Sequence, residues 1–509
     1  MKNGRNVAIT AAIACALSAP LALGPYAVRA DELSDLRTNQ ELLQRRVDQL
    51  AQIPSAGGIF PGGPLAPTAG AGIVGGSFPR SFLIPGTDTS IRVGGEIREN
   101  VMYWITGGNP NALSTNPGST GVVNTAPLSN SGAPARKGHA IFQQSPQQSK
   151  INFETRTPTA WGEARTFMEF DWAGDPAASA RVLSISNNLN TRLRYAYATL
   201  GGFLAGQANS NFTDSDAGME TISFGGLVGG QGVSRIPQVR YTMPLAGWGL
   251  PGALSMSAEA PETEIWTPGG GVFGNTAPGI AGGNPLKSAA PDLTAAWYIP
   301  QPWGHMDFAA VVRPTLQVKD GLFVDRAFTG YGLTFGGDVK PRWFGWDKDY
   351  IVWGFTAGDA IGRYIGVGSS TGTIGLVSNY TPALAATAGG AASIIVKPVR
   401  AFGGTVGYRH QWTPNLRSNI GVGIYHEDIN GLNGAVCTGG SSAAATAARA
   451  AGTAGCNLNK ELVNPTVNVI WSPVAFVDVG LEYMWSQRLT VGNQRVTQQI
   501  LEALFKVKF

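Results

Sequence analysis

The sequence predicts an all-β protein: a transmembrane antiparallel β-barrel of about 16 strands, preceded by a short N-terminal coiled-coil helix. Three observations lead to this fold class. The chain begins like an exported protein, its candidate strands are joined by alternately short and long connections, and its last stretch is an amphipathic strand that ends in Phe509. Beyond the N-terminal segment, no apolar run approaches the roughly 20 residues that a membrane-spanning helix needs.

The first 30 residues have the features of a secretory signal peptide. Lys2 and Arg5 precede an apolar run at 7–23, and Val28-Arg29-Ala30 supplies a small-residue cleavage site. Cleavage after residue 30 removes three of the 37 basic residues and none of the 33 acidic residues, which leaves a net charge of about +1. A nearly neutral chain has no electrostatic reason to bind nucleic acid, so no nucleic-acid partner is expected.

Residues 31–52 form the next distinct segment. Its apolar residues recur every three or four positions, which is typical of a heptad seam. They are Leu33, Leu36, Leu43, Val47 and Leu50, and Gln40 occupies the remaining seam position. This seam predicts an oligomerising coiled coil, with a lone amphipathic helix as the alternative. Residues 53–80 are rich in Gly and Pro and predict an unpacked linker ahead of the barrel, which is assigned to residues 81–509.

The barrel strands are predicted from two-residue alternation. In the first strand, Ile91, Val93 and Ile97 lie on one face, and Arg92 and Glu96 lie on the other. The candidate strands are 90–106, 149–158, 160–173, 189–200, 202–209, 236–244, 253–261, 292–299, 304–317, 328–339, 349–358, 399–412, 416–427, 461–472, 475–488 and 496–509.

The connections between these strands alternate in length. Short turns, such as Gly201-Gly202, Thr413-Pro414-Asn415 and Ser472-Pro473, are followed by long loops. The long loops are 107–148, 174–188, 210–235, 262–291, 359–398 and 428–460. Short turns on one side and long loops on the other are the pattern of outer-membrane barrels.

The last strand closes the predicted barrel. Phe505, Val507 and Phe509 share its apolar face, whereas Lys506 and Lys508 share the polar face. An apolar terminal strand leaves an exposed edge unless it pairs with another strand, here the first one. The pattern resembles the C-terminal signal of bacterial outer-membrane proteins, which implies recognition by the outer-membrane assembly machinery. On this segment alone, an edge strand of a secreted sandwich remains the alternative.

Strand register assigns ten arginines to the barrel interior, because an arginine facing lipid would cost roughly 2–4 kcal/mol at the bilayer centre. Six come from the first four strands and would form a basic ladder down one wall; ordinary solvation of the lumen is the alternative. The ten are Arg92, Arg98, Arg156, Arg165, Arg192, Arg194, Arg240, Arg313, Arg409 and Arg417.

The third long loop contains the acids Asp214, Asp216 and Glu220, followed by a Gly-rich run. If this loop folds inward, it narrows the pore and sets its acids against the arginine ladder. Another long loop contains Cys437 and Cys456, the two cysteines left after signal cleavage, and a pair in an exported chain predicts a disulfide.

The sequence contains no nucleophile elbow, no Walker A loop, no dinucleotide-binding fingerprint and no clustered zinc spacing. His410 and His426 are one hairpin apart and form the only candidate histidine pair, but no serine motif accompanies them. We therefore assign no catalytic residue and no metal site, and we expect neither enzymatic activity nor a cofactor.

Several features of the front of the chain occur together: the heptad segment, the Gly/Pro linker, the run Ile84-Pro85-Gly86-Thr87-Asp88-Thr89-Ser90, the Gly94-Gly95 pair and the hairpin sequence at 151–172. Together they resemble the DcaP-like family of trimeric outer-membrane porins. The resemblance implies a homotrimer in outer-membrane lipid that lets small anionic solutes such as dicarboxylates diffuse through. A non-selective diffusion pore, a barrel-anchored surface structural or adhesion protein, and a secreted lectin-like protein remain alternatives.

Overall fold

The computed structural model of the 509-residue chain describes residues 75–107, 141–174, 190–223, 225–230, 234–267, 271–273, 286–365, 375–379, 385–428, 458–491, 493 and 495–509. The predicted signal peptide (1–30), the predicted coiled coil (31–52), most of the predicted linker and the predicted Cys437–Cys456 disulfide lie outside the described residues.

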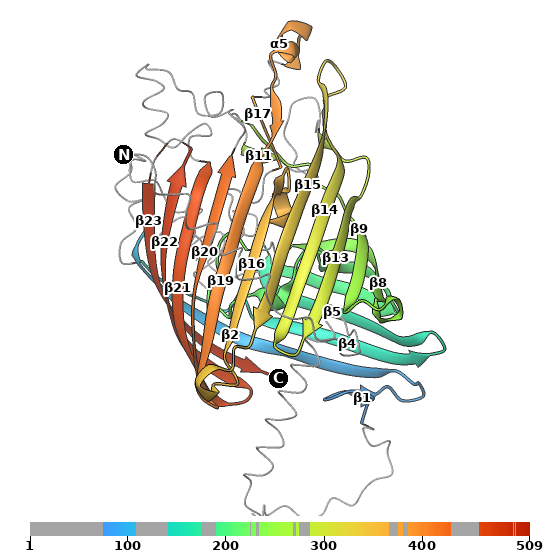
Figure 1. Ribbon diagram of the computed structural model, residues 1–509, viewed down its shortest axis with the longest axis vertical. Coiled ribbons are helices and arrows are strands. Elements are labelled where there is room, and N and C mark those ends of the chain that lie inside the picture. The colour runs from blue at the N-terminus through green and yellow to red at the C-terminus, as the bar shows by residue number, and fades with distance from the viewer. Residues whose placement is uncertain are drawn as a thin grey trace, which may run out of the picture.

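Sixteen antiparallel strands form one closed barrel (Figure 1). The first eight are β2 (Ser90–Thr106), β4 (Lys150–Thr159), β5 (Gly162–Gly174), β6 (Asn190–Leu200), β7 (Phe203–Asn209), β8 (Arg235–Pro244), β9 (Ala253–Glu259) and β13 (Asp292–Gln301). The other eight are β14 (Gly304–Lys319), β15 (Asp325–Val339), β16 (Tyr350–Asp359), β19 (Arg400–Thr413), β20 (Leu416–Asp428), β21 (Asn459–Val474), β22 (Val477–Thr490) and β23 (Arg495–Lys508). Each pairs with the next, and β23 pairs with β2.

These strands confirm the predicted fold class, and their ends lie within three residues of the predicted ends. The turn predicted at Ser472-Pro473 is misplaced: β21 runs through these residues to Val474, with an irregular register between Trp471 and Val474. A bulge tolerates proline because no ladder hydrogen bond is needed there. The sequence also missed β3 (Ile141–Ser145), which pairs with β2 beyond the end of β4.

The closing seam follows the predicted faces. Ile97 pairs with Val507, and Phe509 exchanges two backbone hydrogen bonds with Gly95, of 3.0 and 3.1 Å. Gly95 is needed at this point because a Cβ would lie 2.3 Å from the carbonyl oxygen of Lys150 and 2.8 Å from the Phe509 ring. The chain end therefore completes the hydrogen-bonded wall instead of leaving an edge.

A second, four-stranded sheet lies at the end of the barrel where the long loops gather, near α5 (Ala388–Ala392) (Figure 1). Its strands are β10 (Ile265–Thr267), β11 (Gly271–Phe273), β17 (Leu376–Ser378) and β18 (Val396–Pro398). This sheet was not predicted, because strands of three residues are too short to show alternation. Ile265, Leu376 and Val396 pack with Leu316 and Val318, so the outer loops share a core with the end of β14.

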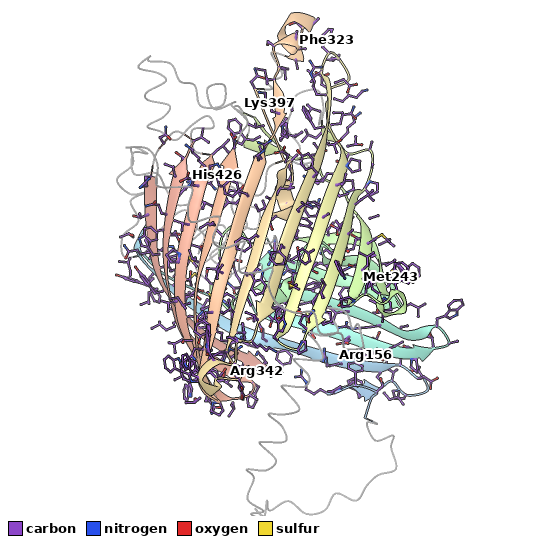
Figure 2. The ribbon with its side chains drawn as sticks, viewed as in Figure 1. Arg156, Met243, Phe323, Arg342, Lys397 and His426 are labelled. Atoms are coloured by element: carbon purple, nitrogen blue, oxygen red, sulfur yellow. The ribbon has the colours of Figure 1, made fainter. Side chains whose placement is uncertain are left out.

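The remaining elements are short. They are β1 (Phe82–Leu83), β12 (Leu286–Lys287), and the single 3₁₀ turns η4 (Ser215–Ala217), η5 (Ala246–Trp248), η6 (Trp343–Gly345) and η7 (Gly362–Tyr364). Within the part of the chain that the structure describes, no helix is long and apolar enough to cross a membrane. Figure 2 shows Phe323 and Lys397 at the long-loop end and Arg342 at the short-turn end.

Candidate functional site

One long connection folds into the barrel and forms much of the candidate site. We call the described residues between β7 and β8, namely 210–223, 225–230 and 234, the inner loop. Glu259 on β9 holds its first turn by accepting a hydrogen bond of 2.8 Å from the Asn211 backbone N–H. Phe212, which is wholly buried, packs edge-on against Tyr364 with 5.6 Å between the ring centroids. The inner loop therefore enters the lumen as a packed segment.

His305 on β14 fastens the next part of the inner loop. Its side chain is fully buried; Nε2 lies 2.7 Å from Oδ2 of Asp214, and Nδ1 contacts the carboxylate of Asp338 on β15. A protonated imidazole donates from both ring nitrogens and so suits two carboxylates. Asp214 thus ties the inner loop to two neighbouring strands.

Glu220 of the inner loop is bound by arginines of the wall. Nε and Nη2 of Arg417 on β20 each donate a hydrogen bond of 2.7 Å to its carboxylate, and Nη1 of Arg409 lies 3.9 Å away. Burial raises the pKa of Glu220, but the hydrogen bonds and charge of Arg417 outweigh it, so the pKa lies below its usual value.

Glu482 on β22 receives the far end of the inner loop. Its two oxygens accept hydrogen bonds from the backbone N–H groups of Ile222 (2.7 Å) and Ser223 (2.8 Å). The backbone of Gly229 then lies against β20, so close that a Cβ would be 1.6 Å from the carbonyl oxygen of Ile424. Its φ of 74° favours glycine as well. The inner loop is therefore fixed along β9, β14, β15 and β20–β22.

The predicted arginine ladder lies on the other side of the lumen, since β4–β6 are half-way round the barrel from β15–β19. Glu154 is its centre. Its side chain is 0% exposed and bonds Arg92, Arg156 (2.7 Å) and Arg165 (2.9 Å), which keep 15%, 21% and 11% of their side chains exposed. The acid is covered and the guanidinium groups reach the water. Arg156 also lies 3.4 Å from Glu163, so three arginines face two acids and the cluster presents one surplus positive charge to the lumen.

The positive charges of the other ladder arginines are more fully balanced by nearby acceptors. Arg192 and Arg194 share Asp171, at 2.6 and 2.8 Å, and Arg194 also bonds Glu169 at 2.6 Å. Arg98 donates to the carbonyl oxygen of Ile222 in the inner loop. The remaining predicted residue on this side, Arg240, donates to the Asn209 carbonyl oxygen at 3.2 Å.

A cavity of about 380 Å³ opens between the ladder and the far wall, at the short-turn end. Six basic side chains and four acidic ones line it, so its charge balance is positive. The basic residues are Arg80, Arg92, Lys150, Arg409, Arg417 and Lys508, and the acidic residues are Glu96, Glu169, Glu220 and Asp478.

The structure separates the predicted site residues into two groups. The cluster around Glu154 borders the lumen, whereas Asp214 and Glu220 face partners on the far wall, and Asp216 lies half-buried within η4. Sequence reasoning did not single out His305 or Glu482, because only the folded barrel brings them to the inner loop. Lys508 was predicted to lie on the polar face but was not assigned to the site.

Two predicted candidates do not join the lumen site. Arg313 is fully buried, where Nε bonds Asp292 at 3.2 Å and Nη1 donates to the Ala360 carbonyl oxygen at 2.8 Å. His410 pairs with Ser418 and His426 pairs with Phe402, so the two histidines lie toward opposite ends of the β19–β20 hairpin. Among the described residues, no group of three or more His, Cys, Asp or Glu side chains could hold a metal ion.

The outer mouth contains a half-buried acid, Glu264, between β9 and β10, and its Oε2 atom is itself buried. Its Oε2 atom would lie 3.0 Å from a Cβ placed on Gly362, so little space separates the two loops here. Burial raises the pKa of Glu264 to about 7, although the positive charge of Arg313 acts in the opposite direction. The carboxyl group therefore titrates within the physiological range.

Comparisons with known proteins agree with this architecture. A family model described as "Porin subfamily" matches residues 80–506. The chain is similar to the outer-membrane channel DcaP of Acinetobacter baumannii, at 20% identity and a TM-score of 0.62, over 86% of this chain and 100% of that one. It is also similar to an anion-selective porin from Comamonas acidovorans, at 9% identity and a TM-score of 0.43, over 83% and 100% of the two chains. No curated protein sequence matches.

Replacing His305 with alanine is expected to loosen the inner loop, because Asp214 and Asp338 would face each other without the imidazole. Removing one partner from a buried ionic contact costs about 3–5 kcal/mol. Hydrogen exchange should become faster in residues 210–223, and single-channel current should become noisier. His426→Ala is the control, since His426 is stacked on Phe402 outside this contact. Equal exchange in both variants would contradict the anchoring role.

The packing of the outer loops is expected to weaken as pH rises from 4.5, the ordinary pKa of Glu264, to about 7, its pKa in the fold. In this interval the unfolded carboxyl group has lost its proton and the folded one has kept it, so stability falls with pH and is level above the interval. Glu264→Gln should abolish this change in limited proteolysis of residues 260–267. Glu262→Gln should retain the change but move it to lower pH, because the charge of Glu262 helps to raise the pKa of Glu264. A pH response that survives Glu264→Gln would assign the titration to another group.

Proposed function

The chain belongs to the porin subfamily, and we propose that this outer-membrane porin lets small anions, dicarboxylates among them, diffuse passively into the periplasm. The family and the closed barrel favour a channel over an enzyme. In such barrels the short turns face the periplasm and the long loops face the outside. The preference for anions is our inference from the charges of the lumen.

One observation supports this preference above the others. Glu154 is covered by Arg92, Arg156 and Arg165, so a solute in the lumen meets guanidinium groups before it meets the carboxylate. In a narrow aqueous path with walls of low dielectric constant, even one surplus positive charge raises the local concentration of anions.

The geometry of arginine favours carboxylates among anions. Its planar fork donates two parallel hydrogen bonds to one carboxylate, and the lumen offers several forks at different heights. A dicarboxylate bound at one arginine can reach the next before it leaves the first. The inner loop adds to this effect because it narrows the lumen opposite the arginines.

We also propose a homotrimer, with the heptad seam of residues 31–52 holding three copies together beneath the barrels. In this proposal, residues 1–30 are cleaved on export, 53–80 act as the linker, and Phe505, Val507 and Phe509 form the signal for the outer-membrane assembly machinery. A disulfide between Cys437 and Cys456 would close an outer loop, as expected in an oxidising compartment.

The anion preference is tested by measuring the reversal potential in a planar bilayer under a KCl gradient. Wild-type protein should favour chloride. Arg92→Gln with Arg156→Gln removes two positive charges and leaves Arg165 paired with Glu154, so the preference for chloride should fall by about twofold or more.

Arg326→Gln with Arg495→Gln is the matched control, because both arginines lie at the long-loop ends of their strands. This control should keep the wild-type reversal potential. A wild-type pore without chloride preference would instead favour the general diffusion pore, and a chain without conductance would favour the surface structural or adhesion protein.

Deletion of residues 31–52 tests the trimer. The truncated protein should insert and conduct, but its heat-stable trimers should dissociate at a lower temperature on a gel, because the helical contacts are gone. A scrambled 31–52 segment that keeps the composition but breaks the heptad is the control and should behave like the deletion. Trimers as stable as those of the wild type in both variants would assign the coiled coil a spacer role.

A further inference from the structure

The turn between β15 and β16, residues 340–349, is unusual among the periplasmic connections. It is rich in both positive charge and aromatic rings, and Figure 2 shows Arg342 at this end of the barrel, opposite Phe323. Its basic residues are Lys340, Arg342 and Lys348, and its aromatic residues are Trp343, Phe344 and Trp346.

The backbone of this turn is strained. Arg342 and Phe344 have φ angles of 50° and 54°, in the left-handed region that residues with side chains rarely adopt. Each such residue costs about 1–3 kcal/mol, and strain of this kind is concentrated at binding and switch sites. The conformation also leaves Phe344 85% exposed. Folding alone gives no reason to expose this ring.

The turn packs on an aromatic cluster of the outer wall. Trp346 meets His410 at 4.5 Å, and His410 meets Trp412 at 4.2 Å between ring centroids, both edge-on. Asp349 is almost fully buried beneath them and accepts hydrogen bonds from the Tyr408 hydroxyl and the Gln411 backbone N–H, while His410 Nδ1 lies 2.8 Å from it. These contacts give the surface a fixed shape.

The positive charges of the turn have no protein partner among the described residues. Arg342 and Lys348 are exposed and form no ion pair there, and the carboxylate of Asp349 is already used by Tyr408 and His410. Asp347 is the one exposed acid of the turn. A turn with exposed cations beside exposed rings is complementary to an anion that is attached to an apolar body.

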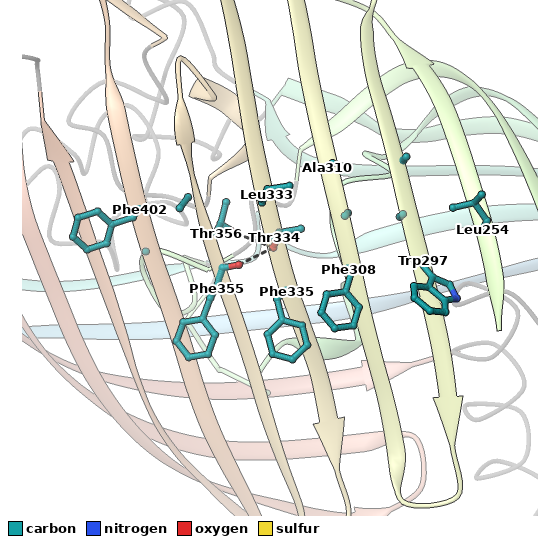
Figure 3. A pocket seen from close by; sticks show the side chains of 15 residues that line it. Leu254, Trp297, Phe308, Ala310, Leu333, Thr334, Phe335, Phe355, Thr356 and Phe402 are labelled. Carbon is teal, nitrogen blue, oxygen red and sulfur yellow. Dashed lines mark hydrogen bonds between the residues drawn. The ribbon is translucent and has the colours of Figure 1, made fainter. Parts of the chain in front are cut away.

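An apolar hollow of about 620 Å³ lies on the outer wall above this turn (Figure 3). Four rings that pair across neighbouring strands form its lower border, namely Trp297, Phe308, Phe335 and Phe355. The next row of residues toward the long loops is Ala295, Ala310, Leu333 and Ala357. The three alanines form the floor of the hollow on either side of Leu333, which is 68% exposed. The large rings below these small side chains leave a depression on the outer wall.

The distance from the turn to the hollow matches one leaflet of a membrane. From Ile351 to Ala357, β16 advances about 20 Å at roughly 3.3 Å per residue. A strand tilted by about 40° then rises about 15 Å along the membrane normal, which is half of the roughly 30 Å hydrocarbon core. An acyl chain whose headgroup lies at the turn would end in the hollow.

We propose that the 340–349 turn and the hollow above it bind one anionic phospholipid of the periplasmic leaflet. The phosphate lies at Arg342 and Lys348, the glycerol region lies against Trp346 and Trp412, and one acyl chain fills the hollow. This site is on the outer wall and is independent of the proposed anion path through the lumen. A second copy of the chain is the competing occupant of the hollow, but it would not satisfy the exposed charges of the turn.

The test is native mass spectrometry of the full-length protein taken from nanodiscs that contain equal amounts of phosphatidylglycerol and phosphatidylcholine. Wild-type protein should retain phosphatidylglycerol preferentially. Arg342→Gln with Lys348→Gln should lower this retention about tenfold, because each basic residue near a headgroup adds to the attraction. Arg326→Gln with Arg495→Gln is the matched control and should retain the lipid as the wild type does.

A second variant, Ala310→Phe, fills the hollow without changing any charge and should also reduce lipid retention. Heat-modifiable gel migration confirms that each variant is folded before it is compared. Equal retention of the two lipids by the wild type, or unchanged retention in the Arg342/Lys348 variant, would overturn the proposal. A change in the number of copies in Ala310→Phe without loss of lipid would identify the hollow as a contact between copies and would also overturn it.

Discussion

The pairing of β2 with β23 removes the last free edge of the sheet, and the rest of the molecule depends on this closure. In a hydrocarbon layer an unpaired backbone N–H or C=O group costs several kcal/mol, so a sheet can cross only when every strand has two neighbours. The chain meets this requirement with its last residue, since Phe509 bonds Gly95 through both backbone groups. Closure also divides the side chains into an outward apolar set and an inward polar set.

The inward-facing polar side chains explain why this lumen is charged and why the inner loop occupies part of it. Charges that face the interior need partners, and the inner loop supplies some of them: Asp214 meets His305, Glu220 meets Arg417, and the backbone at Ile222 meets Glu482. The arginines of the opposite wall find acids on the wall itself, mostly on the neighbouring strand. Because three arginines share Glu154, the compensation is incomplete at the point where the wall remains in contact with water. The need of interior charges for partners therefore produces both the packed inner loop and the positive surface opposite it.

The barrel could be predicted from the sequence because alternation is a local property: Phe505, Val507 and Phe509 indicate one face without knowledge of any other strand. The inward direction of Arg92 and Arg156 follows in the same way. The partners of these arginines cannot be predicted from alternation, since the contact of Glu154 with three arginines depends on the register of three strands. His305 could not be recognised as an anchor because Asp214 is 91 residues away in the sequence. The outer sheet escaped prediction because its strands are too short to show a period.

The most direct test of the account asks whether water and anions pass beside the arginine wall. Thr199 pairs with Arg165 and shares its face, whereas its neighbour Ala198 points outward. With Cys437 and Cys456 replaced by serine, Thr199→Cys should react with an anionic thiosulfonate reagent faster than with a cationic reagent of the same size, and the reaction should lower the single-channel current. Ala198→Cys should leave the current unchanged. Faster reaction with the cationic reagent, or no effect of either reagent at Thr199→Cys, would contradict an anion path along this wall.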